Sequence, residues 1–174
     1  ACLVGSEMCI RDRRKHPDVI GVGEMRSAAE SLSAAESSRT GHTVCTTIHS
    51  NSCTSTYRRM MTLAKRKYNM DDSIIMQIMV EAYPVVVFTK QLEDRSRKIM
   101  EIIEGEDFID GKLIYRSLYK YDVVDNVTEA NGQTRVVGHH RKMGLISETL
   151  KKRLLDNGIS HKELEEFMPE KEVD

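Results

Sequence analysis

The chain has 174 residues, which is enough for one ordinary domain and a little more. Its 26 basic and 27 acidic side chains leave a net charge of -1, which gives no electrostatic footprint for binding nucleic acid or an anionic membrane. No apolar run is long enough to span a bilayer, and the four cysteines lack the spacing of a disulfide-stapled secreted domain. We therefore expect a protein of the reducing cytoplasm.

The first thirteen residues, ACLVGSEMCIRDR, differ in character from the rest of the chain. The string SEMCIRDR resembles translated sequencing-adapter sequence, so residues 1–13 are expected to be a non-native lead without fold or function. An ordinary native helix or strand is the alternative.

Two short apolar runs predict parallel strands that each end in a polar residue. Residues 18–23 are largely apolar and are followed by Glu24, which suits a buried strand with an acid at its carboxyl end. Residues 27–38, rich in Ala, Ser and Glu, predict a helix. The β-branched residues 43–48 then predict a second strand, which is followed by His49.

Further elements alternate along the chain. Residues 51–68 predict a helix, and Asp71 or Asp72 caps the next one, which ends before Pro84. Residues 85–88 predict a third buried strand. The helix before it should place one apolar face against the core: Ile74, Ile75, Ile78, Met79 and Ala82.

The last part of the chain predicts an antiparallel unit followed by helices. Residues 98–103 and 112–124 predict long strands, and Asn131-Gly132 is a strong hairpin signal before residues 135–138. Three signals then delimit two terminal helices. These are an N-cap at Ser147, a stop at Gly158, and a capping box formed by Ser160 and Glu163.

The acid and the histidine that end the two parallel strands suggest one site. An acid at the carboxyl end of such a strand can orient Mg²⁺ or polarise the attacking water in nucleotide hydrolases, although it can also be a solvated Glu without function. A histidine at the neighbouring strand end can donate a hydrogen bond to a terminal phosphate. Glu24 and His49 are therefore expected to face one cleft, although a lone histidine is more commonly structural.

The sequences around Glu24 and His49, taken together, are a far more specific signal of function than either residue alone. PDVIGVGEMR followed by TGHTVCTTIHSNS resembles the Walker B strand and the His box of the type II/IV secretion ATPase superfamily, and STYRRMMTLAKRK extends the similarity. Residues 113–167, with RVVGHHRKMGLISETLKKRLLDNG, most resemble the tight-adherence (Flp pilus, CpaF-type) branch. The resemblance implies an α/β fold: the C-terminal half of a RecA-like P-loop domain over residues 14–104, with a small antiparallel element and C-terminal helices over residues 105–174.

The resemblance also implies roles for individual residues. Glu24 matches the Walker B acid that supports the catalytic water and orients Mg²⁺ through water, without binding the metal directly. His49 matches the histidine that senses the γ-phosphate of ATP. Four further positions match residues associated with the nucleotide: Arg26, Gly41, His42 and Arg59.

At the level of the whole protein, the resemblance implies a cytoplasmic ATPase that is peripheral to the inner membrane. Such a motor forms a homo-oligomer, expected to be a hexamer, and drives pilus assembly or protein secretion with the proteins of an inner-membrane platform. No direct contact with nucleic acid is expected. Two alternatives stay open: a type IV secretion or conjugation motor, and a non-catalytic oligomerisation or partner-docking module.

The sequence contains no phosphate-binding loop of the form G-x-x-x-x-G-K-[ST]. The nearest string, GEDFIDGKL from Gly105, has one residue too many and ends in Leu113 where the Mg²⁺ hydroxyl should be, so it is interpreted as a turn. In the family this loop lies upstream of Walker B. The chain alone is therefore expected to be inactive.

A zinc site is the competing interpretation of the second motif. His42, Cys45, His49 and Cys53 have the spacing H-x-x-C-x-x-x-H-x-x-x-C. Residues three apart on a strand point to opposite faces, so His42 and Cys45 should diverge. The zinc interpretation is therefore the less favoured one.

Overall fold

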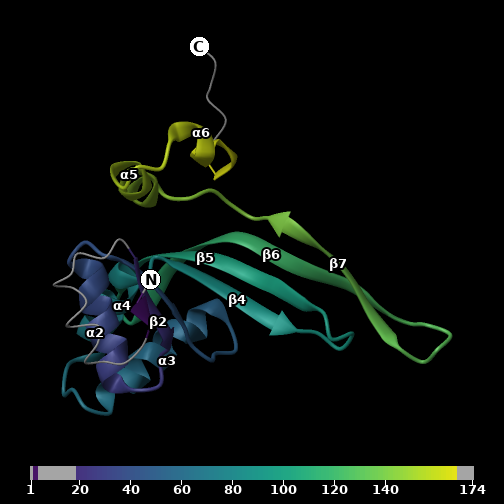
Figure 1. Ribbon diagram of the computed structural model, residues 1–174, viewed down its shortest axis with the longest axis horizontal. Coiled ribbons are helices and arrows are strands. Elements are labelled where there is room, and N and C mark those ends of the chain that lie inside the picture. The colour runs from purple at the N-terminus through teal and green to yellow at the C-terminus, as the bar shows by residue number, and fades with distance from the viewer. Residues whose placement is uncertain (1, 4–18, 168–174) are drawn as a thin grey trace. The chain divides into compact units, whose positions relative to one another are not determined.

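The computed structural model describes residues 2–3 and 19–167 (Figure 1). The chain forms two compact units. The first unit comprises Ala1–Pro84 with Gly105–Ile114, and the second comprises Val85–Glu104 with Tyr115–Asp174. The division into a partial RecA-like domain over residues 14–104 and an antiparallel element with helices over residues 105–174 stays a prediction. None of the helices in the described part is long and apolar enough to cross a membrane.

The first unit contains a parallel sheet that, among the described residues, has the strand order β1-β2-β3. The strands are β1 (Cys2–Leu3), β2 (Val19–Glu24) and β3 (Thr43–Thr47), and both pairings are parallel. Ile20 and Val22 of β2 are buried, as expected for the apolar side chains of a strand inside a core. Both parallel strands predicted from the apolar runs are confirmed.

The short strand β1 lies within the lead that is expected to be non-native. Its two residues pair with Ile20 and Gly21 of β2, so this part of the lead does take part in the sheet. The foreign origin of residues 1–13 stays a prediction, and residues 4–13 lie outside the described part.

Local capping explains where the crossover helix α2 (Ala28–Arg39) begins and ends. The Ser27 hydroxyl accepts a hydrogen bond from the Glu30 N–H, and the Glu30 carboxylate accepts one from the Ser27 N–H. This capping box satisfies donors that the helix leaves unpaired. Gly41, with φ of 96°, lets the chain turn into β3.

The helices α3 (Cys53–Lys65) and α4 (Asp72–Ala82) are also fixed by polar caps. Ser52 and Ser55 form a capping box at the start of α3, and Asp71 caps α4 by accepting the Ser73 N–H. Since α2, α3 and α4 contact one another, their small and apolar faces form the core of the unit. The three helices are seen together in Figure 1.

The predicted apolar face of α4 is partly wrong. The side chain of Ile74 is 48% exposed, and the buried residues are Ile75, Met76, Met79, Val80 and Ala82. In a run that is almost entirely apolar, several stripes have helical spacing, so the pattern alone does not choose among them. Contact with α2 and α3 selects the stripe that includes Met76 and Val80.

A third strand does include residues 85–88, as predicted, but the prediction that it is buried is wrong. β4 (Val85–Gln91) belongs to an antiparallel sheet, pairs with β5, and leaves Val85 and Val87 about half exposed. Only Val86 is buried, so burial alternates along the strand. The reason is its position: β4 lies at the end of the strand order β4-β5-β6-β7 found in the described residues. A continuous apolar run does not by itself distinguish a central strand from an edge strand.

The remaining strands of this sheet confirm the antiparallel prediction and are longer than expected. They are β5 (Arg97–Ile109), β6 (Lys112–Thr128) and β7 (Thr134–Lys142). Asp110 and Gly111, both with positive φ, form the turn between β5 and β6, so the GEDFIDGKL string is a hairpin and no phosphate loop. Gly132, with φ of 78°, forms the turn before β7, as predicted.

Two C-terminal helices follow, α5 (Glu148–Asp156) and α6 (His161–Leu164), and a 3₁₀ turn η2 (Glu165–Phe167) ends the described part. The predicted cap at Ser147 and the capping box of Ser160 and Glu163 are confirmed. The cap of α5 is reinforced from the sheet. Glu104 of β5 is 2% exposed, and its carboxylate accepts hydrogen bonds from both the N–H and the hydroxyl of Ser147.

Ser147→Ala is expected to lower the free energy of unfolding by about 1–3 kcal/mol. The change removes the cap of α5 and also leaves a buried carboxylate with one fewer donor. Ser160→Ala is the matched control, because Ser160 caps a short exposed helix, and it should cost about 0.5–1 kcal/mol. Urea unfolding of both variants measures the difference. Equal costs would show that the link to Glu104 contributes nothing.

Candidate functional site

The carboxyl end of β2 carries Glu24, held by an irregular pairing with β3. The register shifts between Val22 and Glu24, which is paired with Thr47. The Thr47 hydroxyl donates to the Gly23 carbonyl at 2.6 Å, and the Met25 N–H donates to the Thr47 carbonyl at 2.9 Å. Such a bulge re-aims a side chain at a strand end, and here the Glu24 side chain is 26% exposed.

His49 follows β3 by two residues and meets Glu24. The His49 Nε2 atom lies 3.6 Å from the Glu24 Oε1 atom, while the imidazole is 89% exposed. The expectation that the two side chains lie together at the carboxyl ends of adjacent parallel strands is confirmed. This edge is where open α/β sheets bind ligands.

Arg26 is the closest partner of the Glu24 carboxylate. Its Nη2 atom lies 2.6 Å from Glu24 Oε2, and its backbone N–H donates to Glu30 Oε2 at 2.9 Å. The hydrogen bond from Arg26 lowers the pKa of Glu24 below its usual value, and the charge of Arg26 acts in the same direction. Glu24 is therefore a carboxylate at neutral pH, as an acid that orients water or Mg²⁺ must be.

The other residues expected near the nucleotide are divided between two places. Arg59 lies on the exposed face of α3 and lines a surface pocket that also includes His49. Gly41 and His42 precede β3 and so lie at its amino end, whereas Glu24 and His49 lie at the carboxyl edge of the same sheet. The structure therefore does not bring Gly41 and His42 into this cluster.

Arg58 is a residue of the pocket that the sequence interpretation missed. It lines the same pocket as Arg59 and is also exposed. The amphipathic pattern of α3 could have found it: Tyr57, Met60 and Leu63 are buried, so the face that carries Arg58 points outward.

The zinc ligands proposed as an alternative do not come together. Cys45 is exposed on β3, whereas Cys53 is fully buried at the start of α3. Across residues 19–167, no group of three or more His, Cys, Asp or Glu side chains could hold a metal ion. A single carboxylate beside a histidine suits Mg²⁺ that is held through water and through substrate phosphates, which fits the role expected of Glu24.

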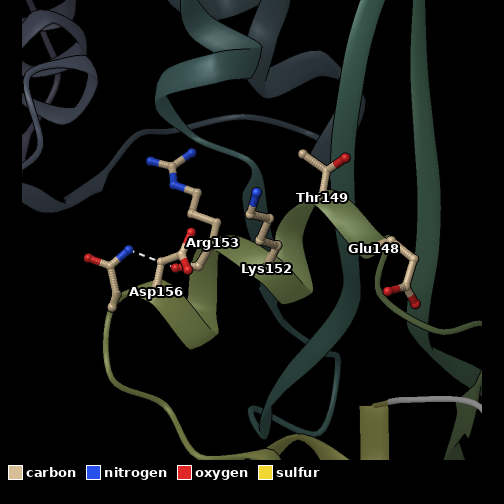
Figure 2. Close-up of a pocket in the computed structure, with 6 residues that line it drawn as sticks. Glu148, Thr149, Lys152, Arg153 and Asp156 are labelled. Atoms are coloured by element: carbon tan, nitrogen blue, oxygen red, sulfur yellow. Dashed lines mark hydrogen bonds between the residues drawn. The ribbon is translucent and has the colours of Figure 1, made fainter.

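A second surface pocket lies on α5. Figure 2 shows Thr149, Lys152 and Arg153 projecting from this helix, beside Glu148 and Asp156. Since the lining carries charges of both signs, it has no preference for an anion or a cation.

The chain resembles known proteins over much of its length. Residues 8–143 match the family model described as "Type II/IV secretion system protein". A stretch of 65 residues is 32% identical to the "Protein transport protein HofB homolog" of Haemophilus influenzae, covering 37% of this chain and 14% of that protein. A stretch of 61 residues is 36% identical to the "Type IV pilus assembly ATPase PilB" of Pseudomonas aeruginosa, covering 35% of this chain and 11% of that protein.

Among solved structures, the VirB11 ATPase from the Brucella suis type IV secretion system, in complex with sulphate, shares the fold. The TM-score is 0.50 with 22% identity, over 56% of this chain and 30% of that one. The mixed α/β fold class predicted from the sequence is confirmed. The matches to the two sequence relatives cover only a small part of those proteins. Because the family model matches well over half of the residues, the chain belongs to the type II/IV secretion system protein family.

Proposed function

We propose that this chain is the part of an ATP-hydrolysing motor that supplies the Walker B acid and the His-box histidine, and that the motor powers pilus assembly or protein secretion across the bacterial envelope. The observation that carries the proposal is the pair of Glu24 and His49, 3.6 Å apart at the carboxyl edge of a parallel sheet. Similarity to a relative named as a pilus assembly ATPase supports it. Within the family, the C-terminal residues favour the tight-adherence, CpaF-type branch.

The chemistry follows from the charges at this edge. ATP would be the substrate and Mg²⁺ its counter-ion. The ionised Glu24 carboxylate would orient the attacking water or a water bound to the metal, and His49 would donate a hydrogen bond to the terminal phosphate. Arg26 fixes the direction of the carboxylate through its contact at 2.6 Å. Fixed dipoles and charges of this kind stabilise the charge that develops during phosphoryl transfer.

The proposal for the whole protein includes a homo-oligomeric ring, taken as a hexamer, that works on the cytoplasmic side of the inner membrane with pilus or secretion platform proteins. The net charge of -1 supports the absence of direct contact with nucleic acid. A second candidate function is a non-catalytic docking or oligomerisation module.

The 174-residue chain by itself is expected to show no ATPase activity and to bind ATP more weakly than micromolar. A phosphate loop supplies the backbone N–H cradle and the lysine that hold the β- and γ-phosphates, and the sequence has neither. Titration calorimetry and a steady-state hydrolysis assay test this directly. A micromolar affinity of this chain for ATP would contradict the proposal that it supplies the Walker B and His-box residues but no phosphate-binding loop.

The test of the proposed function itself is the hydrolysis rate of Glu24→Gln in a protein whose upstream half has been restored. The motor proposal requires a steep fall in rate. The docking-module proposal requires a restored protein that does not hydrolyse ATP at all.

A further inference from the structure

The face of α3 that points away from the core carries two neighbouring arginines. Arg58 and Arg59 are both exposed and line a single surface pocket next to the candidate site. The pocket begins just after β3 and follows about two turns of the helix. Its other lining residues are His49, Ser50, Asn51, Ser55 and Thr62.

The pocket is cationic, and within the described part of the chain its charge is not neutralised. No acidic residue lines it, and α3 contains no Asp or Glu in its 13 residues. No carboxylate of residues 19–167 pairs with the guanidinium of Arg58 or Arg59. By contrast, Arg39 and Arg141 each contact a carboxylate at 2.7 Å. Two like charges side by side repel each other, so a bound anion would stabilise this arrangement.

The geometry of the helix places the pocket-lining side chains together. Ser55, Arg58, Arg59 and Thr62 are three or four positions apart, so they share one face. The Thr62 hydroxyl donates to the Arg58 carbonyl at 2.8 Å, so its proton is already used and the guanidinium groups are the main free donors. The N-terminus of α3, capped by Ser52, carries the positive end of the helix dipole, and the pocket extends to this end of the helix.

We infer that this pocket binds a phosphate-class oxyanion through Arg58 and Arg59, with His49 at its rim. A guanidinium presents paired N–H donors that match the oxygens of a phosphate. His49 connects the pocket to Glu24, so a phosphoryl group held here would lie beside the proposed catalytic acid. That the anion belongs to a nucleotide rests on the proposed function, whereas the binding of an oxyanion does not.

The test is a titration of the ¹⁵N-labelled 174-residue chain with inorganic phosphate, at a constant ionic strength maintained with sodium chloride. We expect saturable shifts of the backbone amides of residues 50–62. Arg58→Gln and Arg59→Gln should each weaken binding by up to about fivefold, and the double variant should lose saturable binding. Arg66→Gln is the matched control, because Arg66 is exposed at the end of the same helix but does not line the pocket.

Two outcomes would overturn the inference: equal shifts with chloride alone, or parental affinity in the double variant. Unchanged amide shifts of Ile20 and Ile75, which are buried and do not line the pocket, will show that the variants are folded. Addition of ATP separates the sources of the anion. Shifts of the same amides assign the pocket to a phosphoryl group of the nucleotide, and shifts with phosphate alone assign it to free phosphate. Failure of the motor proposal would leave phosphate binding by this pocket intact, so the two failures are distinguishable.

Discussion

Glu24→Gln, in the protein with its upstream half restored, is expected to slow ATP hydrolysis by about 10²–10³-fold while ATP binding largely persists. Glutamine keeps the size and much of the hydrogen bonding of the side chain but removes its charge. A carboxylate that orients water or Mg²⁺ needs that charge, and the structure holds Glu24 ionised beside Arg26 and His49. Nucleotide affinity depends chiefly on the phosphate loop and should barely change.

The measurement is the steady-state ATPase rate together with ATP affinity. Cys45→Ser is the control, because Cys45 is exposed on the adjacent strand and has no assigned chemistry. If Glu24→Gln hydrolyses ATP like the parent while Cys45→Ser loses activity together with bound zinc, the zinc interpretation should replace the motor assignment.

The second large effect concerns the stability of the first unit. Tyr57 is fully buried, and its hydroxyl donates to the Tyr83 carbonyl at 2.6 Å. Gly105 lies directly against it, so a Cβ at this position would be 2.4 Å from the Tyr57 hydroxyl oxygen and 2.9 Å from Cζ. Gly105→Ala is expected to lower the free energy of unfolding by about 1–3 kcal/mol through overpacking. Tyr57→Phe should cost a similar amount, about 1–3 kcal/mol, because it leaves a buried carbonyl without its donor.

The two changes together should cost less than the sum of the single changes. Removing the Tyr57 hydroxyl removes the closest atom that the new methyl group meets, so part of the clash disappears. Urea unfolding of the four proteins measures this coupling. Tyr68→Phe, at a partly exposed tyrosine, is the control and should change stability little. Strict additivity would mean that the close contact between Gly105 and Tyr57 does not exist in solution.

The elements around the candidate site could be predicted because their signals are local. Apolar runs that end in Glu24 and His49 define two strands, and parallel pairing necessarily brings their carboxyl ends to one edge. Caps such as Ser147 and Ser160 need only the next few residues, so these helix starts were also predictable. These local features are enough to predict the fold class and the meeting of Glu24 and His49.

The features that sequence reasoning missed depend on contacts between distant segments. The buried stripe of α4 is chosen by the neighbouring helices, which leave Ile74 exposed. The run that begins at Val85 is apolar enough for a central strand, but its partner makes it an edge strand. The hydrogen bond between Ser147 and Glu104 joins residues 43 positions apart, and no local sequence pattern predicts it. Arg58 was not predicted because only its neighbour Arg59 matches the family motif, although both are exposed on α3.

The central claim is that Glu24 and His49 act as one site, and a double-mutant cycle on ATP hydrolysis tests it most directly. In the restored protein, the rates of Glu24→Gln, His49→Ala and the double variant should be compared with the parent. His49→Ala alone should slow turnover while ADP affinity barely changes, since the lost contact is to the γ-phosphate. If the residues act together, the double variant will be about as slow as Glu24→Gln alone. If the two effects multiply fully, or if His49→Ala hydrolyses ATP like the parent, the contact at 3.6 Å does not form a shared catalytic site.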